Sequence, residues 1–97
     1  MTTEETIKLL TDELNSKSSF HRVYAKSWVN AGKDKEAIRH ALIDEMLSEC
    51  FVCLSSNGFD TIYCLTSKEF HNSVIVPMES IIVDKVHAVI LETEIAA

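Results

Sequence analysis

The sequence predicts an α+β fold in which an N-terminal layer of three helices packs on a small, mainly antiparallel C-terminal sheet. Three observations lead to this prediction. Apolar residues recur at helical spacing up to about Cys50, β-branched and aromatic residues dominate after it, and the pair Asn57-Gly58 lies between two β-rich runs. A chain of 97 residues fits a single α+β domain over residues 1–97.

The first helix is predicted from about Thr3 to Leu14. Thr2 and Glu5 have the spacing of a capping box, in which each side chain satisfies a free backbone amide of the first turn. Apolar residues follow at helical spacing up to Leu14, and the polar run from Asn15 to Ser18 ends the pattern.

Two more helices are predicted between Ser18 and Cys50. Ser18 or Ser19 caps the second helix, and Gly32 ends it because glycine accepts a left-handed backbone conformation without steric cost. Asp34 caps the third helix, which ends at Cys50. The predicted apolar face of the second helix consists of Phe20, Val23, Tyr24, Ser27, Trp28 and Ala31.

The second half is predicted to form the sheet. A hairpin with Asn57-Gly58 at its turn pairs residues 51–54 with 59–65, since a type I′ turn needs positive φ at both central residues. Thr66 and Glu69 can form a second capping box, which gives a short helical turn to about Asn72. Strands are then expected near 73–76, where Pro77 ends the strand or makes it an edge, and near 81–91.

The segment 81–91 has two interpretations. Its residues Ile82, Val86, Val89 and Ile90 also fit a helical stripe. However, eight of the seventeen residues from Glu79 to Ile95 are β-branched, and that density favours a strand. The predicted core of the whole fold comprises Leu10, Leu14, Phe20, Trp28, Ile38, Leu42, Leu47, Phe51, Ile62, Val89 and Leu91.

Composition and motifs argue against an enzyme and against a cofactor. No Gly-x-Ser-x-Gly elbow, glycine-rich phosphate loop or His-Glu-x-x-His motif occurs, and both glycines of the chain are already assigned to turns. The net charge of −6 is opposite in sign to that of a general nucleic-acid binder, so nucleic acid is not the expected partner.

The favoured function is therefore stoichiometric docking on another protein with a basic surface. The candidate contact residues are the acidic side chains of the second half, namely Asp60, Glu69, Glu79, Asp84, Glu92 and Glu94. In size and charge the chain resembles small acidic antagonists carried by phages and mobile elements. That resemblance implies a viral inhibitor that blocks a basic nucleic-acid-binding site of a host defence machine.

Two alternatives remain open. The order of three helices and a hairpin is similar to a winged-helix DNA-binding regulator, in which Lys33, Lys35, Arg39 and His40 would begin the reading helix. The second alternative is a small zinc domain with the ligands Cys50, Cys53, Cys64 and His71, although the bulky residues between the first two cysteines disfavour it. No metal is expected in the favoured interpretation.

The expected location is the cytoplasm. The acidic start of the chain lacks the basic residues and apolar run of a secretory signal. No apolar stretch is long enough to span a bilayer, so no membrane association is expected. Three cysteines without a secretory context are expected to remain reduced.

Overall fold

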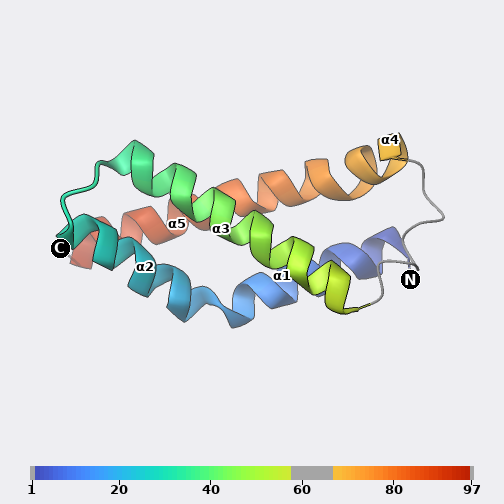
Figure 1. Cartoon of the computed structure of the whole chain (residues 1–97), viewed down its shortest axis with the longest axis horizontal. Helices are drawn as coiled ribbons and strands as arrows, with labels where there is room; N and C mark the ends of the chain where they lie inside the picture. The colour runs from blue at the N-terminus through green and yellow to red at the C-terminus, as the bar shows by residue number, and fades with distance from the viewer. Residues whose placement is uncertain (1, 58–66, 97) are drawn as a thin grey trace.

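Helices account for all the regular structure that can be described in this chain. The computed structural model describes residues 2–57 and 67–96, which form a rod of 45 × 22 × 17 Å (Figure 1). Its elements are α1 (Thr3–Ser16), α2 (Ser18–Asn30), α3 (Lys35–Ser56), α4 (Ser67–Phe70), the π-helical turn η2 (His71–Ile75) and α5 (Val76–Ala96).

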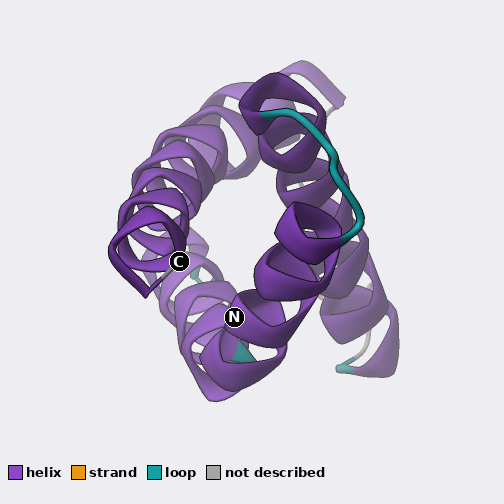
Figure 2. Ribbon diagram, turned by 90° about the vertical axis from the view of Figure 1, so that its left-hand side faces the viewer, coloured by secondary structure: helices purple, strands orange, loops and turns teal. Residues whose placement is uncertain are grey.

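The helices of this rod-shaped molecule form three long helical segments, which we call the rods. Only Lys17 separates α1 from α2, α3 runs back in the opposite direction, and α4, η2 and α5 follow one another without a break. The view along the long axis shows the rods surrounding a common centre (Figure 2). Contacts from Asn15 to Lys85 and from Arg22 to Glu92 share an offset of 70 residues, so α5 runs parallel to α1 and α2.

The predicted sheet is wrong, and its first strand is the end of α3. Residues 51–54 continue the helix because Cys53 and Leu54 extend the buried stripe of Leu42 and Met46 at helical spacing. Asn57 ends α3, since its side-chain amide donates to the carbonyl of Cys53 at 2.9 Å. Gly58 and the second predicted strand, 59–65, lie outside the described residues.

The predicted strands near 73–76 and 81–91 are also wrong, because both segments are helical. Burial decides the second case: Met78, Ile82 and Val86 recur every four residues and are all buried against the other helices. A helix brings these side chains onto one face, and tertiary packing outweighs the β-preference of the branched residues.

Pro77 lies just after the π-helical turn. There the amide of Val76 donates to the carbonyl of His71, five residues earlier. The widened turn gives room for the proline ring, which in a regular α-helix clashes with the carbonyl of Ser73 four residues before it. The helix therefore passes through Pro77, and Val74 remains on its buried face.

Three predicted helix ends agree with the structure, whereas the predicted ends at Leu14, Cys50 and about Asn72 are wrong because the helices continue past them. The capping box of Thr2 and Glu5 is confirmed, and Asp34 Oδ1 accepts from the amide of Ala37 at 2.8 Å. Gly32 has φ of 81°, which confirms its predicted left-handed conformation. The predicted serine cap of α2 is wrong: Lys17 occupies the cap position, without a side-chain hydrogen bond. Thr66 of the second predicted capping box lies outside the described residues.

The core runs along the shared axis of the rods. Leu10, Leu14, Ile38, Leu42 and Val89 are buried, as predicted. Phe20, Phe51 and Leu91 are exposed, contrary to prediction, while Trp28 and Leu47 are partly buried and Ile62 lies outside the described residues. The three errors fall on helices whose buried face or whose type was misassigned from the sequence.

Candidate functional site

The outward side of α2 carries an aromatic and apolar surface. Phe20, Val23 and Tyr24 are 62%, 67% and 43% exposed, and they fall on adjacent turns of one side of the helix. The ring of Tyr24 stacks on that of Trp28, with centroids 5.6 Å apart and planes at 25°. We call Phe20, Val23, Tyr24 and Trp28 the α2 stripe.

The α2 stripe coincides with the predicted apolar face of this helix, but that face points outward. The buried side carries His21 and Ala25, one turn apart, and these two residues face α3 and α5. A polar imidazole and a methyl group gave a weaker sequence signal than three aromatic rings, so the periodicity alone favoured the wrong side. The rings of Phe20 and Tyr24 remain exposed to solvent, where they need a partner to be buried, whereas Trp28 is partly buried against the core.

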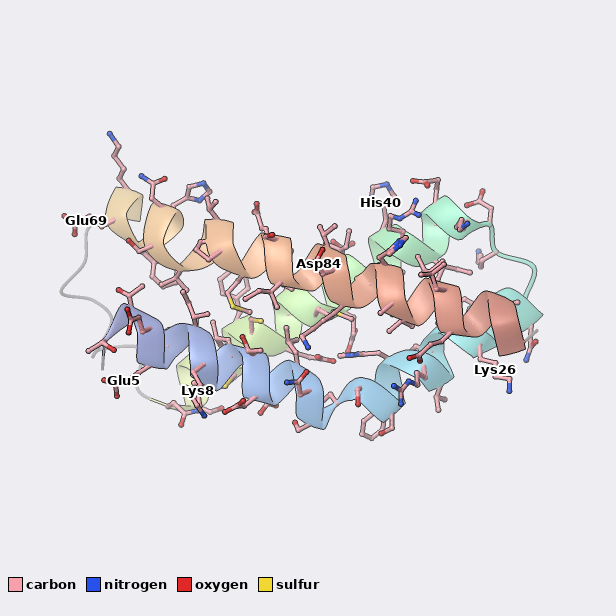
Figure 3. All side chains as sticks on the ribbon, turned by 180° about the vertical axis from the view of Figure 1, so that it is seen from behind. Glu5, Lys8, Lys26, His40, Glu69 and Asp84 are labelled. Atoms are coloured by element: carbon pink, nitrogen blue, oxygen red, sulfur yellow. The ribbon has the colours of Figure 1, made fainter. Side chains whose placement is uncertain are left out.

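The chain around α2 is locally basic. Residues 15–33 contain four of the nine Lys and Arg residues and none of the 15 Asp and Glu residues. This segment therefore carries a formal charge of +4 and the rest of the chain −10. Figure 3 places Lys26 at one end of the rod and Glu5 and Glu69 at the other. The uneven charge distribution gives α2 the opposite sign to the molecule as a whole.

Other exposed apolar residues are more dispersed. Phe51 and Val52 lie on the outer side of α3, in a shallow open depression that Asp44 and three serines also line. On α5, Val76, Val83 and Leu91 are exposed, but successive members are seven or eight residues apart. Neither set places aromatic rings on consecutive turns as the α2 stripe does.

A buried polar pair links α2 to α3. His21 Nε2 lies 2.8 Å from Oε2 and 3.0 Å from Oε1 of Glu49, and the two side chains are 2% and 8% exposed. The two side chains share one hydrogen-bonding proton, which satisfies a polar group on each of them inside the core. This pair was not predicted from the sequence. One feature of the sequence could have indicated the pair, because each residue falls on an apolar helix face. His21 lies one turn from Ala25, and Glu49 lies between Met46 and Cys53.

A cavity of about 280 Å³ lies beside the pair. It lies between α5 and the junction of α1 with α2. Its lining includes His21, Ser18 and Met46. Arg22 and Glu92, joined at 2.6 Å, line it on one side, and the bonded pair Asn15 and Lys85 lines it on the other. No described hydrogen bond joins Ser18 to His21, so the described contacts do not assemble a nucleophile with its base.

The predicted acidic contact residues are not brought together. Figure 3 shows Glu69 at one end of the rod and Asp84 near its middle, and Glu79 lies on α5 between them in sequence. Glu92 forms an ion pair with Arg22. Asp60 and the side chain of Glu94 lie outside the described residues. The described members of the set therefore do not form one acidic patch.

The winged-helix alternative lacks its first wing strand, because residues 51–54 are helical. Its proposed reading residues Lys33, Lys35, Arg39 and His40 do lie close in sequence, at the start of α3. Figure 3 shows His40 near the same end of the rod as Lys26. Arg39 forms an ion pair with Glu36, so the proposed reading surface at the start of α3 also carries an acidic residue.

The proposed zinc ligands are separated. Cys50 and Cys53 lie on the buried face of α3, His71 is exposed on η2, and Cys64 lies outside the described residues. Burial, followed by the nearby Cys53, Glu49 and Glu13, raises the pKa of Cys50 to about 11. Burial also raises the pKa of Cys53. Over residues 2–57 and 67–96, no three His, Cys, Asp or Glu side chains are grouped to hold a metal ion.

Comparison with known proteins adds no assignment to this geometry. No family model, curated protein or solved structure matches the chain. None of the described helices is long and apolar enough to cross a membrane. The arrangement of the side chains is therefore the basis for the functional argument.

Proposed function

We propose that the protein is a non-catalytic binding module that docks on another protein through the α2 stripe. The observation that carries this proposal is the exposure of Phe20, Val23 and Tyr24 on adjacent turns of one helix. Aromatic residues are enriched at the centres of protein interfaces, where they contribute most of the binding free energy. Three outward-facing side chains of this kind are costly to leave in water and effective once covered.

The partner is a protein with an apolar groove bordered by acidic side chains. A helix places residues i, i+4 and i+8 on one ridge, and Phe20, Tyr24 and Trp28 have this spacing. Residues 15–33 have a formal charge of +4, of which Lys17 and Arg22 pair with Glu13 and Glu92 outside the segment. Lys26 and Lys33 contribute the rest of this positive charge, which favours an acidic border. The α2 stripe replaces the acidic residues of the second half as the proposed contact surface, because the described acidic residues are scattered.

Such a module acts by occupying a site on its partner, without turnover. The small mobile-element antagonists that the chain resembles in size and charge also act by occupancy, but they block basic sites, so the proposal shares their mode of action and not their kind of target. Occupancy requires the protein in amounts comparable with its target, whereas an enzyme is effective at far lower amounts. The ratio of protein to target at half-maximal effect therefore separates the two classes.

The test is affinity capture from native cells, with and without nuclease, followed by titration of the purified partner. We expect one protein partner in both arms, bound at a fixed ratio and more weakly as salt rises. The variant Phe20→Ser/Val23→Ser should abolish capture and keep the stability of the wild type, because both side chains are exposed.

The matched control is Val76→Ser/Val83→Ser, which changes two exposed apolar residues on α5. It should retain capture. Equal loss in both double variants, or capture that survives the α2 double variant, would contradict docking through the α2 stripe. Recovery of nucleic acid alone, lost on nuclease treatment, would favour the DNA-binding alternative.

A further inference from the structure

The cavity of about 280 Å³ beside His21 is lined partly by apolar and partly by polar side chains. Leu14, Met46 and Val89 line it and are buried, so they provide its apolar surface. His21 and Ser18 line it from α2. A mainly apolar pocket with a small number of placed polar groups is typical of a site for a small molecule.

The imidazole of His21 has one nitrogen to offer to this cavity. Its side chain is 2% exposed, and both contacts with Glu49 use Nε2. The described residues provide no hydrogen bond to Nδ1, yet among them no side-chain nitrogen or oxygen is both fully buried and without a partner. Nδ1 therefore borders space that a small molecule can enter, and the cavity that His21 lines is that space.

The hydroxyl of Ser18 is the second polar group available to a ligand. Ser18 precedes His21 by three residues on α2, so the two side chains lie on the same side of the helix. Within the described part of the chain this hydroxyl forms no hydrogen bond, and Ser18 is only partly buried. A ligand atom between the two side chains can therefore bond to both of them.

The charged residues of the lining already have partners. Arg22 Nε donates to the carboxylate of Glu92 at 2.6 Å, and Lys85 donates to the side-chain oxygen of Asn15. These contacts join α5 to α2 and to α1. A ligand therefore needs no charge to match this lining, and the polar groups left for it are the imidazole nitrogen and the hydroxyl.

A hydroxyl group fits these two polar groups best. It both donates and accepts, so it can bond to Nδ1 whichever nitrogen of the imidazole carries the proton. An anion in the same position is disfavoured, because it loses hydration and lies across the imidazole from the carboxylate of Glu49. The polar part of the ligand is therefore neutral.

The volume of the cavity sets the size of the apolar part. An apolar protein cavity of about 150 Å³ accommodates benzene. The space beside His21, about 280 Å³, is roughly twice as large, so it fits two fused rings or an alkyl group of similar volume. A long acyl chain or a peptide is too large for it.

We propose that this cavity binds a small neutral molecule that combines a hydroxyl group with an apolar body of up to two fused rings. The body packs against Leu14, Met46 and Val89, and the hydroxyl bonds to Nδ1 of His21 and to Ser18. Such a ligand would contact α1, α2, α3 and α5 together and stabilise the folded chain. This site is separate from the α2 stripe, whose exposed side chains face outward.

The test is titration of the full chain at neutral pH with β-naphthol, β-methylnaphthalene and β-naphthoate, followed by methyl NMR. The three probes share a ring system and differ only in the hydroxyl, methyl or carboxylate group. β-Naphthol should shift the methyl signals of Leu14, Met46 and Val89 in a saturable manner. Its dissociation constant should be about tenfold lower than that of β-methylnaphthalene, which leaves the imidazole nitrogen unpaired. β-Naphthoate should bind most weakly.

Substitutions locate the hydroxyl group. Ser18→Ala should weaken β-naphthol binding severalfold and leave β-methylnaphthalene binding unchanged. Ser19→Ala is the matched control, because Ser19 is exposed and does not line the cavity. The double variant His21→Leu/Glu49→Leu removes the imidazole together with its partner, and it should abolish the preference for the hydroxyl. Ala88→Phe, at an exposed position of the lining, should block all three probes.

The proposal is overturned if β-naphthol leaves these methyl signals unmoved, or if β-methylnaphthalene binds as tightly as β-naphthol. It is also overturned if β-naphthoate binds most tightly, since that result assigns binding to the charge of Lys85, or if Ser19→Ala weakens β-naphthol as much as Ser18→Ala does. If Ala88→Phe or the double variant fails to fold, the three probes and the serine variants still decide the question. None of these measurements involves the protein partner, so their outcome is independent of docking through the α2 stripe.

Discussion

His21 and Glu49 form a buried polar contact in a molecule whose core is otherwise mainly apolar. Because the pair joins α2 to α3, it fixes which side of α2 faces inward. A rotation of α2 that buried the aromatic rings would take His21 away from Glu49 and leave a carboxylate in the core without its partner. That loss is costly enough to oppose the gain from burying the rings.

A double-mutant cycle tests this role. We expect His21→Leu and Glu49→Leu each to lower the free energy of unfolding by about 3 kcal/mol, because each leaves a buried polar group without its partner. The variant with both substitutions should recover most of that loss, since no unpaired group remains. Urea denaturation of the four proteins provides the measurement. Additive losses in the double variant would show that the two side chains do not act as a pair.

The thiol of Cys50 gives a prediction in alkaline solution. Its pKa is raised from an ordinary 9.0 to about 11 in the folded protein, mainly by burial. Between these values the unfolded chain loses the thiol proton and the folded chain keeps it. Stability from this group is therefore complete below pH 9 and falls as pH rises towards 11, by about 2–3 kcal/mol in total.

The measurement is the free energy of unfolding at pH 8, 9.5 and 10.5, compared between the wild type and Cys50→Ala. The variant should lose less stability over this range, because it has no thiol at position 50 to titrate. Parallel pH profiles for the two proteins would exclude Cys50 as the source of the effect. Cys50 of the folded protein should also react slowly with iodoacetamide at pH 8, as read by mass spectrometry of its peptide, because the neutral thiol is favoured.

At the scale of single elements, Gly32 between α2 and α3 gives the simplest prediction. Its φ of 81° is unfavourable for any residue with a Cβ atom, yet a Cβ placed there would meet no atom within 4 Å. Gly32→Ala should therefore cost only the backbone term, about 1–2 kcal/mol, in thermal or urea unfolding. Gly32→Asn should cost less, because asparagine tolerates this conformation better. A loss well above this range would indicate a steric contact near Gly32.

The sequence predicted the helix ends at Thr2, Gly32 and Asp34 because each end depends on a few adjacent residues. The capping oxygens and the glycine conformation are local properties, and tertiary packing did not change them. The secondary structure of the second half, helix or strand, was not predictable in the same way. There the β-branched residues favour strands locally, and the stripe of Met78, Ile82 and Val86 favours a helix only once other helices provide a surface to bury it.

The candidate site was less accessible from sequence than the fold. The residues of the α2 stripe were recognised as one face, but their exposure depends on His21 meeting Glu49, which lies 28 residues away. No short-range spacing connects the two. The six acidic residues of the second half were grouped by composition, and the four of them on α5 are distributed along and around a helix of 21 residues.

At the scale of the whole molecule, α5 is the element on which the others converge. It contacts α1, α2 and α3, and it contributes six of the buried apolar residues if the adjoining Val74 is counted with Met78, Ile82, Val86, Val89 and Ile90. The paired contacts at Asn15 and Arg22 also end on this helix. The first three helices alone therefore leave one wall of the core open.

This order along the chain has a consequence for protein synthesis. A ribosome adds about 5–20 residues per second, so α1, α2 and α3 are made seconds before the helix that covers them. During that interval Leu10, Leu14 and Leu42 have no α5 to pack against, and the emerging chain exposes apolar surface of the kind that chaperones bind. The position of α5 in the chain thus places the closing step of folding after the first three helices have been made.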